Sequence, residues 1–172
     1  MPNPSSRPKY AKSSSVDVSE SKNEIEKNLL RYGATQFVYG WETDRAQVGF
    51  EIDGRQVRIL LLLPPREEFA TVNAGARGVV RRSEAETDSV WQQAVRSRWR
   101  ALSFIVKAKL VAVEAGITTI EREFLSDLVL PTGQTVGEWL APQLDDIYEK
   151  HEYPMLMAGL GEAKPLPPRR PK

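Results

Sequence analysis

Three consecutive segments between Phe37 and Leu63 place an apolar side chain at every second position, and this alternation constrains the fold more than any other feature. A period of two is typical of β-strands that bury one face. The apolar positions are Phe37, Tyr39 and Trp41, then Ala46, Val48, Phe50 and Ile52, then Val57, Ile59, Leu61 and Leu63. Asp53-Gly54 is a strong hairpin signal, residues 42–45 form the other turn, and Pro64-Pro65 ends the third strand. The segment therefore predicts a three-stranded antiparallel meander.

Helix starts are marked by four capping-box patterns, in which Ser or Thr is followed three positions later by Glu where helical apolar spacing begins. The pairs are Ser21–Glu24, Ser83–Glu86, Thr118–Glu121 and Thr135–Glu138. They predict helices over about 22–32, 84–115, 119–127 and 136–150, with Gly33 and Gly116 ending the first two. The core stripe of the long helix is Trp91, Val95, Trp99, Leu102, Val106, Leu110 and Val113. Because residues 101–113 are apolar on most sides, we expect this part to lie in the middle of the fold.

These elements predict an α+β protein, a three-stranded antiparallel meander with helices packed on one face, in the order α-β-β-β-α-α-(β)-α. The bracketed strand is a short one at Leu128–Leu130, and residues 66–82 are predicted to form a long polar loop. One domain over residues 19–157 contains all of these elements. Residues 1–18 are rich in Ser, Pro and Lys, and residues 158–172 in Pro and Arg, so we predict a flexible N-terminal arm and a flexible tail.

The residue types present argue against several kinds of catalysis. The chain has no cysteine, which excludes disulfides, thiol nucleophiles and Cys-ligated zinc and fits a reducing compartment. Its one histidine, His151, follows the last predicted helix and is interpreted as a solvated helix-end residue. The glycines at 75 and 78 lack the Lys-Ser/Thr of a phosphate-binding loop. We therefore predict a protein that is not an enzyme and that binds no metal or other cofactor.

Membrane insertion is not predicted either. The longest purely apolar run, Ile59–Leu63, is far shorter than the roughly 20 residues of a transmembrane helix. Residues 1–15 lack the apolar centre of a signal peptide. We expect a cytoplasmic protein without a membrane partner, and the sequence leaves open whether it forms a homo-oligomer.

Charge is distributed unevenly along the chain, although the formal net charge is only +1. Residues 77–109 carry eight basic and three acidic groups, whereas residues 110–153 carry two basic and nine acidic groups. A basic segment followed by an acidic one has two interpretations. The two segments face each other within the fold, or each of them faces a partner.

The basic segment contains the first candidate binding site. Three arginines lie in the predicted loop, and three further basic residues form one stripe on the long helix; the six are Arg77, Arg81, Arg82, Arg96, Arg100 and Lys107. Together they could follow a phosphate backbone, while Tyr39 and Trp41 are candidates for stacking on bases. This favours an accessory protein that binds nucleic acid, with a preference for single strands. The structural alternative buries the aromatic strand face in the core and leaves the stripe solvated or paired with the acidic segment.

The acidic segment contains the second candidate site, at Glu121, Glu123, Asp127, Asp145, Asp146 and Glu149. A solvated acidic face is the simplest interpretation of such a set. The alternative function that it supports is a protein-binding or inhibitory module acting through this face. A magnesium site is less favoured, because no lysine or carboxylate on a strand completes the arrangement that metal nucleases use.

Two stretches of the chain resemble a family of small tailed-phage and prophage proteins of no known activity. The first is K-N-E-I-E-K-N-L-L-R-Y-G-A-T-Q-F-V-Y-G-W at 22–41, and the second, at 91–140, includes K-A-K-L-V-A-V-E-A-G-I-T-T at 107–119 and V-L-P-T-G-Q-T-V-G-E-W-L at 129–140. The resemblance implies a phage origin and a bacterial host cytoplasm, where a host or phage protein would be the partner of a host-takeover or anti-defence factor. It implies no activity and no catalytic residue.

Overall fold

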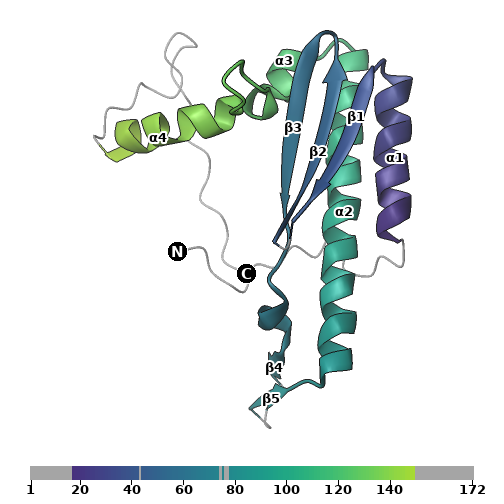
Figure 1. Ribbon diagram of the computed structural model, residues 1–172, viewed down its shortest axis with the longest axis vertical. Coiled ribbons are helices and arrows are strands. Elements are labelled where there is room, and N and C mark those ends of the chain that lie inside the picture. Colours follow the sequence, from purple (N-terminus) through teal and green to yellow (C-terminus); the bar gives the residue numbers. More distant parts are fainter. Residues whose placement is uncertain (1–16, 43, 74, 76–77, 150–172) are drawn as a thin grey trace, which may run out of the picture.

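A three-stranded antiparallel sheet covered on one face by two parallel helices forms the body of the protein (Figure 1). The computed structural model describes residues 17–149 except 43, 74, 76 and 77. The strands are β1 (Gln36–Trp41), β2 (Arg45–Ile52) and β3 (Arg55–Leu62), in that order across the sheet, and the covering helices are α1 (Val18–Arg31) and α2 (Glu84–Glu114). The α+β class, the meander and the position of the helices on one face are therefore as the sequence predicts.

The core lies between this sheet and the two helices. From the sheet it takes the predicted inward positions of β2 and β3, and from α2 the predicted stripe; its buried members include Val48, Phe50, Ile52, Val57, Trp99, Leu102, Val106 and Leu110. Ile25 and Leu29 of α1 complete it and are fully buried. Asp53 and Gly54 both have positive φ, 49° and 70°, which suits a two-residue type I′ hairpin turn.

The long helix α2 begins and ends where the sequence predicts. Ser83 and Glu86 form the capping box, with the Glu86 N–H donating to Ser83 Oγ at 3.3 Å and the Ser83 N–H donating to Glu86 Oε2 at 2.9 Å. Gly116, at φ 67°, follows the helix end. The helix has 31 residues, whereas β2 and β3 have eight each, so its first turns extend well beyond the sheet (Figure 1).

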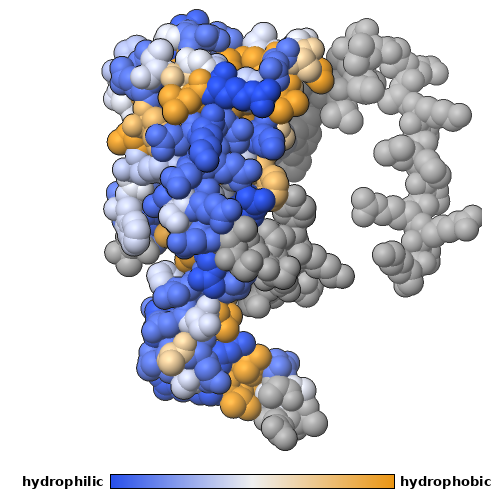
Figure 2. Space-filling view, turned by 90° about the vertical axis from the view of Figure 1, so that its right-hand side faces the viewer, coloured by the Kyte–Doolittle hydropathy of each residue, from blue (hydrophilic) through white to orange (hydrophobic). Residues whose placement is uncertain are grey.

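The predicted long loop at 66–82 is wrong, because this segment contains regular structure beside the start of α2. It forms a 3-10 helix, η1 (Arg66–Phe69), and a short hairpin of β4 (Thr71–Asn73) and β5 (Val79–Arg81). Arg66 forms ion pairs with Glu84 and Asp88 of α2 and so attaches the segment to the helix. Hydrophobic side chains gather at this narrow end of the molecule, where Val79 is 73% exposed (Figure 2).

Two of the four predicted capping boxes are wrong. Helix α1 starts earlier than expected, with Asp17 as its N-cap, so Ser21 is buried inside the helix and Glu24 is used elsewhere. At the Thr118–Glu121 pattern the N-cap is Thr119, one residue later than predicted. In each case another residue with a capping side chain lies nearby, Asp17 before the first pattern and Thr119 directly after Thr118, and local sequence alone does not decide between the two candidates.

The segment after α2 is less regular than predicted. Instead of one helix over 119–127, the chain forms the short α3 (Ile120–Glu123) and the 3-10 helix η3 (Leu125–Asp127). The extra strand predicted at 128–130 is reduced to two isolated bridges, Val57 to Leu128 and Val129 to Thr135. The final helix, α4 (Val136–Glu149), has the predicted start. Most of the two predicted arms and His151 lie outside the described residues, although Val18 belongs to α1 and packs against the core.

Replacement of Trp99 by alanine tests the position of the core. Trp99 is 3% exposed and its ring packs edge-on against Tyr39 with 5.8 Å between the centroids. Removing a buried tryptophan leaves a cavity, so we expect the free energy of unfolding to fall by about 3–5 kcal/mol in urea titrations. The matched control is Trp139→Ala on α4, where the side chain is 52% exposed and the expected loss is below about 1 kcal/mol. Equal losses would contradict the placement of the core.

Candidate functional site

The basic stripe predicted on α2 is divided by α1. Arg100 Nη1 lies 2.6 Å from Glu24 Oε2, and Ser103 Oγ donates to the same oxygen at 2.8 Å. The Arg100 and Glu24 side chains are only 25% and 29% exposed. Arg100 also stacks on the Phe104 ring, with its guanidinium carbon 4.4 Å from the centroid. Its charge is therefore compensated between the two helices, by a glutamate of α1 rather than by the acidic segment.

The other two residues of the stripe differ from Arg100. Arg96 is half-buried and donates to Gln93 Oε1 at 2.8 Å. Lys107 is exposed, and it forms no ion pair or hydrogen bond with any residue that the structure describes. The stripe therefore does not present three equivalent cations to solvent.

The predicted loop arginines are also separated from the stripe. Arg82 donates to the backbone oxygens of Phe69 and Thr71, at 2.8 and 3.0 Å, and so holds η1 and β4 in place. Arg81 is exposed on β5, at the end of α2 furthest from Lys107 (Figure 1). Arg77 lies outside the described residues.

The two candidate stacking residues have opposite environments. The Tyr39 hydroxyl donates to the backbone oxygen of Lys22 at 2.6 Å, and its ring contacts Phe37 and Trp99 edge-on. Burial, assisted by the charge of Glu26, raises the pKa of Tyr39 well above its usual range. This ring is partly buried and packs against the core, as the structural alternative expects. Trp41 is 80% exposed, and only this aromatic residue of the pair is accessible for stacking.

Most of the acidic candidates near α3 are tied to neighbouring basic groups. Glu121 pairs with Arg55 of β3 at 3.3 Å, and Glu123 lies 3.9 Å from Lys109 of α2. Burial raises the pKa of Asp127, while the Lys109 charge and a hydrogen bond with Ser126 act against this. Asp145, Asp146 and Glu149 are on α4, away from these three, and are exposed. The acidic residues therefore do not form one continuous surface.

The contacts that the structure describes between helix α4 and the body lie at the base of the helix. Thr135 and Glu138 form a capping box, with the Glu138 N–H donating to Thr135 Oγ1 at 3.1 Å and the Thr135 N–H donating to Glu138 Oε2 at 2.7 Å. The same carboxylate pairs with Arg58 of β3 at 2.8 Å. Gly137 is packed so closely on η3 that a Cβ there would lie 2.9 Å from the Ser126 oxygen. These contacts orient the helix from its first turn.

Beyond this base, α4 leaves the body of the molecule (Figure 1). None of the fourteen residues described in it is buried. Leu144 is 41% and Ile147 is 43% exposed, and with Leu140 they share one side of the helix. The sequence predicts this apolar spacing, but it cannot show that nothing in the described chain covers it.

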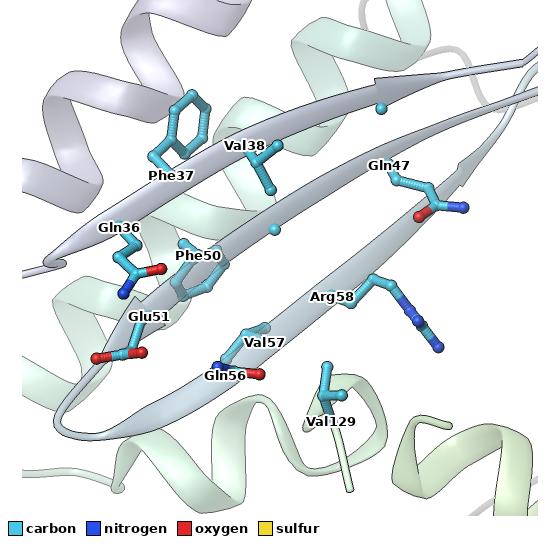
Figure 3. A pocket seen from close by; sticks show the side chains of 12 residues that line it. Gln36, Phe37, Val38, Gln47, Phe50, Glu51, Gln56, Val57, Arg58 and Val129 are labelled. Carbon is cyan, nitrogen blue, oxygen red and sulfur yellow. The ribbon is translucent and has the colours of Figure 1, made fainter. Parts of the chain in front are cut away.

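The sheet face opposite the helices carries a shallow hollow of about 420 Å³ (Figure 3). Val38, Gln47 and Arg58 project beside it, and Gly49 forms part of its floor. A Cβ at Gly49 would lie 2.7 Å from Val38 Cγ1, so a larger residue at this position would force the Val38 side chain to move. Gln36 and Gln56 also line the hollow, which therefore offers amide and aliphatic contacts to a ligand.

The described part of the chain is acidic as a whole. Of the 24 Lys and Arg residues and 23 Asp and Glu residues in the sequence, nine and two respectively lie outside it, which leaves 15 basic and 21 acidic groups. No group of three or more His, Cys, Asp or Glu in this part is placed to hold a metal ion. Among the described helices, none is long and apolar enough to cross a membrane.

Comparison with known protein families, with curated proteins and with solved structures finds no match for this chain.

Arg100 and Lys107 provide a direct test of how α1 divides the basic stripe. Changing Arg100 to Gln leaves the partly buried Glu24 carboxylate without its cation, so we expect a loss of about 1–2 kcal/mol in the free energy of unfolding. Lys107→Gln removes the same charge from an exposed position and should change stability by less than about 0.5 kcal/mol. Chemical denaturation measures both. A Lys107 variant as unstable as the Arg100 variant would contradict this assignment.

Asp127 is expected to reduce stability at neutral pH. Burial raises its folded-state pKa, so the folded protein holds the proton of this carboxyl more tightly than the unfolded chain does. The stability gained from the protonated carboxyl is fully present below the unfolded-state pKa and is lost as pH rises through the folded-state pKa. Asp127→Asn should therefore raise the melting temperature at pH 7, and the gain should vanish below a pH of about 3.9. Thermal melts across this range test the sign, with Asp145→Asn on the exposed part of α4 as control. A gain that grows in acid would refute it.

Proposed function

We propose that this chain is a non-enzymatic protein-binding module whose binding element is α4. One observation carries the proposal: α4 is anchored by its first turn, yet none of its described residues is buried. A helix whose apolar side is not buried is rarely stable at this length, because most helical stability in proteins comes from packing of that side. A partner that covers the face of Leu140, Leu144 and Ile147 would supply this packing.

The chemistry of α4 describes the partner surface that it fits. Apolar side chains spaced by four and three residues are typical of a helix that enters a hydrophobic groove. The opposite side carries Glu138 and Asp145, and the helix has four acidic residues and no basic one. We therefore propose an apolar groove with a basic rim as its receptor. The capping box and the Arg58 ion pair hold the helix in position beforehand, which lowers the entropic cost of binding.

The sequence favours nucleic-acid binding over protein binding, and this proposal reverses that order. Of the proposed nucleic-acid contacts, Arg100 is compensated by Glu24, Arg82 holds backbone oxygens, and Tyr39 is in the core. The described part has six more acidic than basic groups, which disfavours non-specific attraction to phosphates. Binding to a nucleic acid is therefore treated as an outcome of the test, and the phage setting stays a prediction.

The test compares a variant of α4 with a matched variant of the sheet. Leu144→Asp with Ile147→Asp adds two charges to the apolar side of α4, and Leu60→Asp with Leu62→Asp adds two charges to the open sheet face, where these leucines are 46% and 59% exposed. Immobilised proteins are incubated with nuclease-treated bacterial extract containing soluble copies of the same chain. We expect wild type and the sheet variant to retain a protein in stoichiometric amount and the α4 variant to lose it.

Two results would contradict the proposal. One is that the α4 variant retains the same proteins as wild type. The other is that fluorescence anisotropy shows wild type binding a single strand of roughly 30 nucleotides at low salt, with an affinity that the α4 variant shares and that falls steeply with salt.

A further inference from the structure

Helix α2 carries a second apolar stripe, on the side that faces away from the sheet. At about 100° per residue, this side is opposite Trp99, Leu102 and Val106. We call it the outer stripe; its members are Ala101, Ile105, Ala108, Val111 and Ala112, each of which is three or four residues from another member. Ile105 is 51% and Val111 is 44% exposed. The expectation that residues 101–113 are enclosed in the fold is therefore wrong for this side of the helix.

Basic residues border the outer stripe. From Ser89 to Val113 the helix has five basic residues and no acidic one. Arg98 and Lys107 are exposed and lie on opposite sides of the outer stripe, where Arg98 also donates to the Leu62 backbone oxygen at 3.3 Å. An apolar surface with basic edges is the type of receptor that α4 requires. The charges of the two helices are complementary, since α4 has four acidic residues and no basic one.

The two surfaces do not meet within one chain. Helix α4 starts beside β3, packs on η3 and runs away from α2 (Figure 1). The outer stripe lies on the side of α2 opposite the residues that pack on the sheet, whereas α4 leaves the body beside the β3 edge (Figure 1). Of the two arrangements that the uneven charge of the sequence leaves open, the structure therefore favours the one in which the basic and acidic segments each face a partner.

We propose that the partner of α4 is a second copy of this chain, which receives the helix on the outer stripe of its α2. This inference rests on the proposed function, because it names the receptor of α4. The donated and receiving surfaces are different, so the contact is heterologous, and each copy can donate to one neighbour and receive from another. Such a contact builds a closed ring or an open filament. A single helix of this length buries little area, so each contact is expected to be weak and the assembly to depend on concentration.

The experiment uses two complementary variants of the full chain. The donor variant is Leu144→Asp with Ile147→Asp, and the receiver variant is Ile105→Asp with Val111→Asp. In sedimentation velocity, the average mass of the wild-type species should rise with protein concentration, and added salt should reduce this rise. Each variant alone should remain monomeric. An equimolar mixture of the two should form a dimer that grows no further, because it contains only one intact pair of complementary surfaces.

A second receiver variant controls for the possibility that the first one misfolds. Arg98→Glu with Lys107→Glu leaves the apolar residues unchanged and reverses only the charges at the edge. It should melt at nearly the wild-type temperature, because exposed charges contribute little to folding. It should also lose at least tenfold in self-association affinity at low salt. Because its α4 is intact and the donor variant keeps an unchanged outer stripe, the two should still form the mixed dimer at the same concentration as the first receiver variant.

The outcomes that overturn the inference are distinct from those that overturn the proposed function. If the donor variant associates as well as wild type, the outer stripe pairs with itself. If association requires added nucleic acid, the basic edge binds phosphate. If wild type is monomeric at every concentration while α4 still retains a different protein from the extract, the receptor is that protein and only this inference fails. If wild type is monomeric and α4 retains nothing, both proposals fail together.

Discussion

Burial of one face of the three-stranded sheet against α1 and α2 is the constraint on which the other features depend. The inward residues of β2 and β3 meet Trp99, Leu102, Val106 and Leu110 of α2, and each large side chain removed from water contributes about 1.5–3 kcal/mol. Because this inner stripe must face the sheet, the rotation of α2 about its axis is determined. The apolar residues on its other side, including Ile105 and Val111, are then directed toward solvent. The same layer leaves α4 to begin at the edge of β3 and extend away from the core.

The ion pairs reinforce this layering at its edges. Glu24 connects α1 to α2 through Arg100 and Ser103. This pairing compensates the charge of Arg100, which is partly desolvated between the two helices. The segment after α2 is attached by pairs such as Arg55 with Glu121 and Arg58 with Glu138. Each segment is thus partly compensated by residues elsewhere in the described chain, and no extended pairing joins the two segments. The surfaces that keep both apolar area and charge are the outer stripe of α2 and the exposed side of α4.

Local signals in the sequence predict much of the fold. The meander, the Asp53-Gly54 turn, two capping boxes and the inner stripe of α2 are all correct, because each depends on residues close together in the chain. The errors occur where distant residues decide. Glu24 does not cap α1, since its partners are in another helix 76 and 79 positions away. Tyr39, a candidate for stacking on bases, lies against Trp99, as the alternative of a core position for the aromatic strand face expects. Periodicity shows which residues share a side of a helix, but not what covers that side, so the exposed stripes of α2 and α4 could be recognised only in the structure.

Disulfide trapping between two single-cysteine proteins tests the central claim most directly, because the chain has no cysteine of its own. Ala108→Cys places a thiol on the outer stripe of α2, and Leu140→Cys places one on the apolar side of α4. After mild oxidation of an equimolar mixture, we expect the mixed disulfide to be the main cross-linked product, with little homodimer of either protein. A main product made of two Ala108→Cys chains would contradict the head-to-tail contact and show that two α2 helices pair with each other. A mixed product no more abundant than that formed with Gln47→Cys, on the opposite face of the sheet, would contradict any specific contact between α4 and α2.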